Sequence, residues 1–238
     1  MFDDIDTRVS PALDPETYRA VEGYNDTTRM FVDDVVNAFN DIYVTVGKVH
    51  DARQLAEKNP AWTPENRILI VGQEANKQKD RAVRRLALAE RDLRARIAHT
   101  ECELTSPLTE RAGLGSLNGE VRSFVRGLDR SKREAFMREA LERDDGPTLE
   151  AILGAQPFLS GLTPLDHEHF LRLHHVKRNP HLVVRLDLMK RFLDMIERNG
   201  SIVHVQFDKA IGAKPSVVGA LQVANDQALA ALKIEPTG

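Results

Sequence analysis

The chain has 238 residues, of which 42% are hydrophobic and 29% are charged, and its formal net charge is −3. This balance is typical of a folded soluble protein and excludes an intrinsically disordered chain. Cys102 is the single cysteine, which excludes a disulfide framework or a cysteine-based zinc site within one chain. No apolar run reaches 18 residues and residues 1–10 lack a signal-peptide pattern, so we expect a cytoplasmic protein without a membrane span.

Residues 1–25 are acidic and are interrupted by Pro11 and Pro15, which predicts an N-terminal arm with one short helix. From about Asp26 a helical pattern begins. Its apolar residues alternate between spacings of three and four, as in a heptad seam: Val32, Val35, Phe39, Ile42, Val46 and Val49. Asn59-Pro60 ends this pattern, because proline disfavours the helical conformation of the residue before it.

A second helix is predicted from Thr63 to about Leu104, with Thr63 as N-cap and Pro64 in the first helical position. Its seam is thinner and includes several alanines and Lys79, and its main apolar members are Ile68, Leu86, Leu93 and Ile97. Two long seams joined by a short loop predict an antiparallel, coiled-coil-like helical hairpin over residues 26–104. Such a hairpin needs further packing partners, so two alternatives stay open: self-association, or a bundle within the chain.

Shorter helices are expected after the breakpoint "SPLTERAGLGSLNGE" at residues 105–119. A capping box predicts a helix that begins at Ser131, and further helices are expected at the following ranges: 148–154, 164–178, 181–198 and 215–233. Asn199-Gly200 is a strong signal for a helix end, and "SIVHVQF" after it is interpreted as helix or extended linker. The sequence therefore predicts an all-α chain with an arm (1–25), a hairpin (26–104) and a compact C-terminal helical domain (105–238).

Five of the eight histidines lie in the segment "LDHEHFLRLHHVKRNPH", residues 165–181. On a helix, two metal ligands of one face stand three or four positions apart, and no pair in this segment has that spacing. A helical wheel places His169 beside Leu165, Leu173 and Val176, so His169 is the histidine expected to face the core. We expect His167, His174 and His175 to face solvent. The pattern predicts no metal ligand, cofactor site or catalytic residue.

Other motifs also argue against common enzyme chemistry. "GLGSLNG", residues 113–119, departs from the dinucleotide-binding spacing and is interpreted as a loop between helices. Cys102 lies between two glutamates, a setting that argues against a nucleophilic thiol. The basic stretch 77–96 offers candidate nucleic-acid contacts, although acidic residues interrupt it: Arg81, Arg84, Arg85 and Arg91.

The segments "AILGAQPFLSGLTPLDHEHFLRLHHVKRNP", "RLDLMKRFLDMIERNG" and "FDKAIGAKPSVVGALQVAN" resemble the C-terminal part of uncharacterised helical proteins encoded by tailed phages and prophages. The resemblance covers roughly residues 148–226. It implies a structural or assembly protein that acts in the host cytoplasm or becomes part of a virion, with Phe158 and Leu159 anchoring a turn.

The function expected from the sequence is therefore non-enzymatic: the chain would associate with itself or with other virion proteins through the hairpin. The residues expected at that contact are the apolar seam members Val35, Phe39, Ile42, Val46, Ile68, Leu86, Leu93 and Ile97. Two alternatives remain open, a nucleic-acid-associated protein that uses the basic stretch and a metal-dependent hydrolase that uses the His-rich segment.

Overall fold

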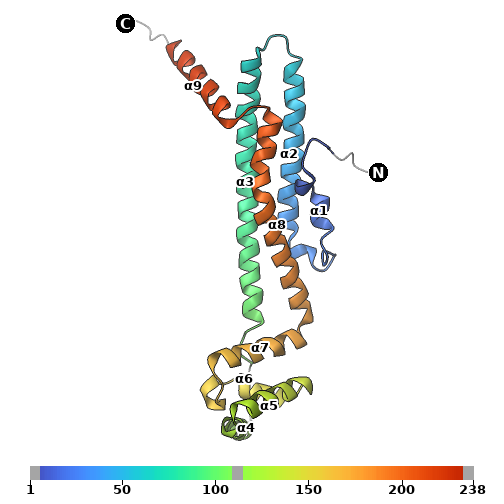
Figure 1. The fold of residues 1–238 in the computed structure, drawn as a ribbon, viewed down its shortest axis with the longest axis vertical. Helices are drawn as coiled ribbons and strands as arrows, with labels where there is room; N and C mark the ends of the chain where they lie inside the picture. The colour runs from blue at the N-terminus through green and yellow to red at the C-terminus, as the bar shows by residue number, and fades with distance from the viewer. Residues whose placement is uncertain (1–5, 109–114, 233–238) are drawn as a thin grey trace. The chain divides into compact units, whose positions relative to one another are not determined.

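We describe residues 6–108 and 115–232 in a computed structural model of the chain (Figure 1). Every regular element in these ranges is a helix, which confirms the all-α class. The chain forms two compact units: the first contains Met1–Arg94 and Leu188–Gly238, and the second contains Ala95–Asp187. This division differs from the expected domain boundaries, because the segment from Leu188 onward groups with the N-terminal part of the chain.

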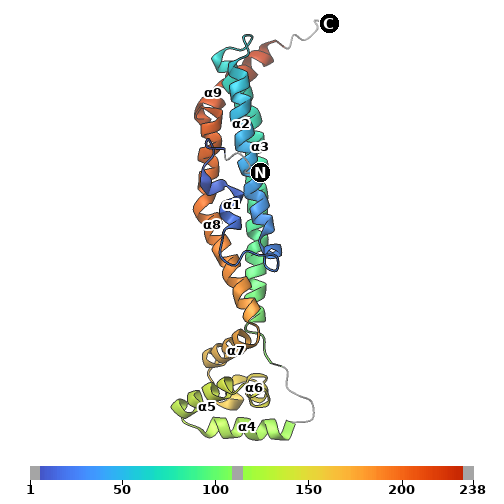
Figure 2. The same cartoon turned by 90° about the vertical axis from the view of Figure 1, so that its right-hand side faces the viewer.

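Long helices build the first unit. They are α2 (Asp33–Glu57), α3 (Pro64–Glu103) and α8 (Pro180–Ile211), and the parts of α3 and α8 that belong to this unit lie beside α2 in both Figure 1 and Figure 2. The Thr63 hydroxyl accepts a hydrogen bond from the Asn66 amide at 3.2 Å and caps α3, as its position before Pro64 predicted. Because α8 packs beside α2 and α3, their apolar seams have a third helix of the same chain to cover them.

The N-terminal arm fills the space between α2 and α8. It contains the 3-10 turn η1 (Pro11–Leu13) and the short helix α1 (Pro15–Arg19), and a second 3-10 turn, η2 (Arg29–Phe31), follows it just before α2. The fully buried Tyr18 ring stacks on Phe39 of α2 at a centroid distance of 4.2 Å and lies 6.1 Å from the ring of Phe192 in α8. This aromatic contact joins three parts of the unit that are far apart in the sequence.

Helix α8 continues through Asn199-Gly200, so the predicted helix end at this position is wrong. The Asn199 amide nitrogen donates to the Tyr18 hydroxyl at 2.9 Å and to the Ala12 carbonyl at 3.2 Å. The following segment, "SIVHVQF", is helical, and its Val203 and Phe207 are fully buried. Tertiary contacts with the arm therefore outweigh the local preference of an Asn-Gly pair to end a helix.

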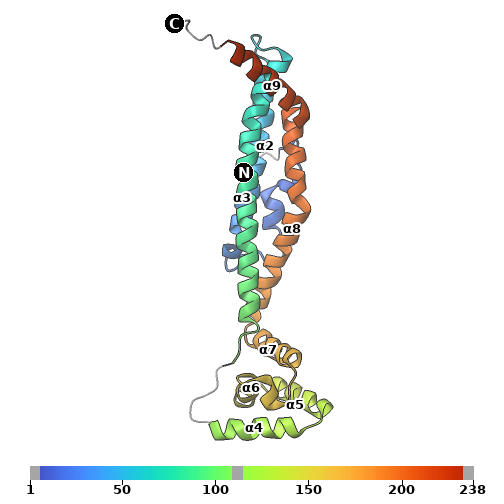
Figure 3. The same cartoon turned by 90° about the vertical axis from the view of Figure 1, so that its left-hand side faces the viewer.

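The second unit is built from shorter helices, visible in Figure 3: α4 (Gly115–Gly127), α5 (Arg130–Glu142), α6 (Gly146–Leu153), η3 (Pro157–Ser160) and α7 (Pro164–Arg178). Its core is an apolar cluster from all four α-helices and the turn before α7: Val125, Met137, Ala140, Leu141, Leu149, Ile152, Leu153, Leu162, Phe170 and Leu171. Phe158 is 68% exposed, so it does not anchor the turn at η3 as expected.

Basic side chains of the second unit hold the ends of its helices. The Arg133 guanidinium donates to the carbonyls of Val125 at 3.1 Å and Leu128 at 2.8 Å, and it also reaches the Gly161 carbonyl. Lys177 donates to the Leu141 carbonyl at 2.6 Å. The contacts with Val125, Leu128 and Leu141 add donors to carbonyls at or just beyond the ends of α4 and α5, where positive charge also complements the negative end of the helix dipole.

Two local expectations in this unit are corrected. Helix α5 begins at Arg130 with Asp129 as its N-cap, because the Asp129 carboxylate accepts from the Lys132 amide at 2.9 Å, and Ser131 lies inside the helix. Helix α4 was not predicted, and residues 115–119 of the expected loop form its first turn; residues 113–114 lie outside the described ranges. The three glycines of residues 113–119 favoured the prediction of a loop, because glycine has a low helix propensity.

Replacing Tyr18 by alanine should destabilise the first unit by about 3–5 kcal/mol, since it removes a fully buried ring that contacts both α2 and α8. The free energy of unfolding is measured by urea denaturation followed by circular dichroism. Met30→Ala is the control, because Met30 is 68% exposed and its truncation should cost almost nothing. Equal effects of the two substitutions would contradict the role given to Tyr18.

Candidate functional site

The apolar residues expected at a contact between chains lie in the core of a single chain. Seven of the eight are buried: Val35, Phe39, Ile42, Val46, Leu86, Leu93 and Ile97. Ile68 is the exception and remains partly exposed at the wall of a pocket. Packing within the chain accounts for the seam, so a surface for other chains has to consist of other residues.

The four candidate nucleic-acid contacts do not form an uninterrupted basic surface. Arg85 pairs with Asp41 of α2, and the Arg91 guanidinium lies 2.8 Å from the Asp92 carboxylate. Arg94, in the same stretch, pairs with both Glu90 and Glu197 at 2.8 Å. Arg81 and Arg84 are exposed on α3. Since neighbouring carboxylates neutralise much of this charge, a solvated helix face explains the stretch at least as well as a phosphate-binding surface.

The structure reverses the expected orientation of the His-rich helix. His169 is exposed, whereas His174 is buried together with Phe170 and Leu171, and His167 is partly buried. The buried stripe has positions 167, 170, 171 and 174, which is a regular helical spacing. The helical wheel was centred on Leu165 and Leu173, but these two leucines are 76% and 39% exposed, so the prediction for His169 was wrong.

Burial affects the protonation of two histidines in α7. The His167 Nε2 atom lies 3.2 Å from the Leu153 carbonyl oxygen, where a neutral imidazole can donate its proton. Removal from water lowers the pKa of His167 and of His174, and electrostatic repulsion from His175 and Arg178 adds to the effect at His174. Both side chains therefore favour the neutral form in the folded unit.

One open pocket of the second unit, about 430 Å³ in volume, brings together residues with reactive side chains, among them His99, Cys102, Ser106, His175 and His181. The His175 Nε2 atom lies 2.7 Å from the Ser106 carbonyl oxygen and 3.4 Å from the Ser106 hydroxyl. A carbonyl oxygen only accepts, so this Nε2 carries a proton and does not act as a base toward the hydroxyl.

The metal-dependent alternative finds no support in the geometry of this pocket. Within residues 6–108 and 115–232, no group of three His, Cys, Asp or Glu side chains is arranged to hold a metal ion. No helix of those ranges has both the length and the apolar character needed to cross a bilayer.

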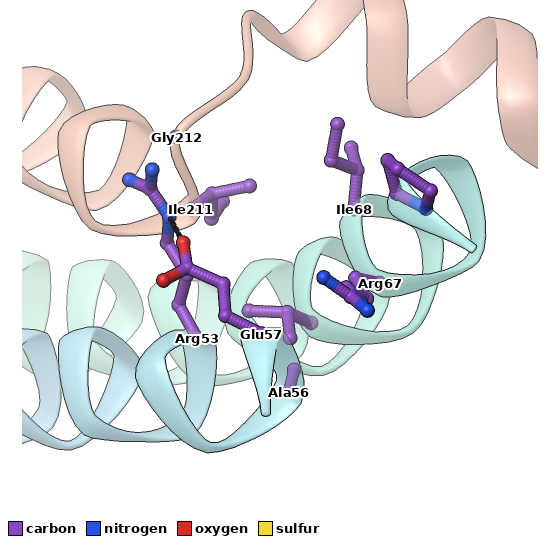
Figure 4. A pocket seen from close by; sticks show the side chains of 9 residues that line it. Arg53, Ala56, Glu57, Arg67, Ile68, Ile211 and Gly212 are labelled. Carbon is purple, nitrogen blue, oxygen red and sulfur yellow. Dashed lines mark hydrogen bonds and ion pairs between the residues drawn. The ribbon is translucent and has the colours of Figure 1, made fainter. Parts of the chain in front are cut away.

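A second pocket, of about 230 Å³, lies in the first unit between the end of α2, the start of α3 and the end of α8 (Figure 4). Its apolar wall consists of Ala56, Pro64, Ile68, Val71 and Ile211. Its charged groups are Arg53, Glu57 and Arg67, and the Arg53 Nε atom lies 3.1 Å from the Glu57 carboxylate. This pocket combines an apolar wall with a surplus of one positive charge.

Gly212 lines one side of this pocket, and its backbone conformation favours glycine. Its φ angle is +78°, and a Cβ atom at this position would stand 2.3 Å from Nη1 of Arg53. A side chain would therefore be strained and would also displace the Arg53 guanidinium. The glycine permits the chain to turn at the end of α8 while Arg53 rests against its backbone.

Helix α9 (Pro215–Ala231) presents an apolar surface to solvent. Val218 is buried against Gly72 of α3, and Gln73 of α3 is hydrogen-bonded to Gln222. Figure 1 shows the rest of α9 running away from the long helices. Five of its apolar residues share one face at heptad spacing, and all of these except the partly exposed Leu221 are exposed: Val217, Leu221, Ala224, Ala228 and Ala231.

Sequence reasoning did not find the two most distinctive sites. The α9 face had a signal, the 4-3-4-3 spacing of Val217 to Ala231, but solvent exposure of this face is a tertiary property. The pocket had no local signal, because Arg53, Arg67 and Gly212 come from three separate segments.

Comparison of the chain with protein-family models, with curated proteins and with solved structures finds no match. Function therefore has to be argued from these surfaces and pockets themselves.

The stability of the second unit should fall as the pH drops below about 6.5, the ordinary pKa of histidine. The folded-state pKa values of His167 and His174 are lowered, so the unfolded chain takes up protons first and gains stability relative to the folded state. The measurement compares thermal unfolding at pH 7.5 and pH 5.0. His174→Gln should reduce the difference, whereas His169→Gln, on the exposed side of the same helix, should leave it unchanged. An identical pH dependence in both variants would contradict this assignment.

Proposed function

We propose that the protein is a non-enzymatic assembly protein that contacts other protein chains, including copies of itself, through the apolar face of α9. The observation that carries this proposal is the exposure of that face. Val217 is 44% exposed, and Ala224, Ala228 and Ala231 are also exposed. Apolar residues at heptad spacing are the usual pairing surface of one helix with another.

The charge distribution of α9 supports a helix as its partner. Asp226 is the one charged residue in Pro215–Ala231, and it lies on the side of the helix opposite Ala224 and Ala228. The apolar face therefore adds no like-charge repulsion when another apolar helix, including α9 of a second copy, packs against it. Alanines at several positions of the seam also permit a close approach of the two helix backbones.

In this proposal α2 and α3 form a coiled-coil-like hairpin that serves as a rigid support. Seam residues of both helices are buried, and the ion pair between Arg85 and Asp41 joins the two helices on their surface. A well-packed support keeps the first turn of α9 in place, because Val218 packs on Gly72 of α3. The hairpin thus contributes to assembly by holding α9, and its seam is not the contact surface.

The biological context of the proposal rests on the resemblance to uncharacterised helical proteins of tailed phages and prophages. That resemblance includes α9 from its start to Asn225. We infer that the partners are further copies of the chain or other virion proteins, and that assembly takes place in the host cytoplasm or within the virion.

Ala228→Glu should weaken or abolish self-association, because it places a charge in the middle of the apolar face of α9. The native mass is measured by analytical ultracentrifugation over a protein concentration range of about 1–100 μM, in which weak helix-mediated contacts change their occupancy. We expect the wild-type mass to rise with concentration and the mass of the variant to stay at or near that of one chain.

Ala230→Glu is a closely matched control. It makes the same change two residues away, at an exposed position on the other side of α9, and should assemble as the wild type does. Equal masses for all three proteins over the whole concentration range would remove α9 as a self-association surface.

A further inference from the structure

The pocket at the ends of α2, α3 and α8 contains a guanidinium group that lacks an acidic partner. Arg67 donates from Nη2 to the Asn59 carbonyl at 3.1 Å, while its Nε atom is buried and has no hydrogen-bond partner. Within the described ranges no carboxylate forms an ion pair with Arg67, and the nearby Glu57 is already paired with Arg53. Such a half-buried positive charge is stabilised by an anion that enters the pocket.

The chemistry of the remaining wall restricts the kind of anion. Ile68, Val71 and Ile211 form an apolar side of the pocket, and Figure 4 shows Ile68 and Ile211 there. A fully hydrated inorganic ion would make no favourable contact with this side. Arg53 and Glu57 neutralise each other, which leaves the single positive charge of Arg67 as a poor match for a dianion such as phosphate. The lining of the pocket therefore favours a ligand that carries one negative charge on an apolar group.

Size sets the last limit. The volume of about 230 Å³ is below the range of roughly 300–1,000 Å³ that is typical of pockets for drug-sized ligands. A molecule with a short aliphatic chain fits this space, whereas a nucleotide or a sugar phosphate does not. Gly212 keeps the pocket open on the side of α8, since a side chain there would displace Arg53.

We propose that this pocket binds a small aliphatic monocarboxylate, whose carboxylate pairs with Arg67 and whose apolar chain packs on Ile68, Val71 and Ile211. Arg53 does not supply a second free charge, because it is paired with Glu57, and together these two residues form the rim of the pocket. This site is separate from the apolar face of α9, so binding of a carboxylate and self-association can each be present without the other.

The probe for the test is sodium 4-methylpentanoate, titrated into the isotopically labelled full-length protein and followed by amide chemical shifts. We expect saturable binding with a Kd of about 1 mM or tighter, with shifts centred on Ile68, Val71 and Gly212. The neutral 4-methylpentan-1-ol should bind at least about tenfold more weakly, because it lacks the charge that pairs with Arg67. Inorganic phosphate at the same concentration should not compete.

Variants locate the site. Arg67→Gln should weaken binding of 4-methylpentanoate at least about tenfold, and Ile68→Trp should also do so by filling the pocket while keeping the charge. Arg84→Gln, an exposed position on the same helix, should bind as the wild type does. If Arg67→Gln does not fold, Ile68→Trp and the neutral alcohol still decide the question.

Three results would overturn the proposal. The first is the absence of saturable shifts in the wild type up to about 20 mM 4-methylpentanoate, well above the expected Kd. The second is unchanged affinity in a folded Arg67→Gln or Ile68→Trp variant. The third is equal or tighter binding of the alcohol or of phosphate, which would show that a monocarboxylate is not the preferred ligand.

Discussion

The packing of Tyr18 between Phe39 and Phe192 is the contact on which the first unit depends. It joins the arm, α2 and α8, and the Tyr18 hydroxyl, which a buried ring has to satisfy, is hydrogen-bonded to the Ala12 carbonyl and to Asn199. The same arm holds α8 about two turns further on, where the Gln206 side chain accepts from the Ser10 amide at 3.1 Å. Helix α8 is thereby held against α2 and stays helical through Asn199-Gly200.

This packing determines which surfaces remain for other molecules. Because α8 covers the seams of α2 and α3, Phe39, Ile42 and Leu93 are buried within the chain and cannot contact another molecule. The end of α8 then closes the pocket that Arg53 and Arg67 line. After the turn at Gly212, α9 contacts α3 through Val218 and Gln222 and leaves its apolar face exposed. Both proposed sites are thus consequences of where α8 ends.

Much of the fold could be predicted from local patterns, because they have local causes. Thr63-Pro64 begins α3 as expected, and the heptad spacing of Val35 to Val46 marks a buried face. The predictions were wrong where tertiary contacts determine a helix end or the buried side of a helix. Asn199 is hydrogen-bonded to the arm and lies inside α8, where a helix end was expected. In the second unit His174 is buried in the core and His169 is exposed, the reverse of the prediction. Of the candidate sites, the seam residues proved to be core, and the pocket around Arg67 depends on three segments that only folding brings together.

Native-state hydrogen exchange over residues 192–206 of α8 tests the central claim most directly, namely that the arm makes α8 one continuous helix and locks it to α2. If the claim is right, these amides are protected to the same degree as those of residues 35–46 in α2, because both segments open together with the first unit. Fast exchange that begins at Asn199-Gly200 while residues 35–46 stay protected would contradict it, since the helix would then break where the arm is supposed to hold it.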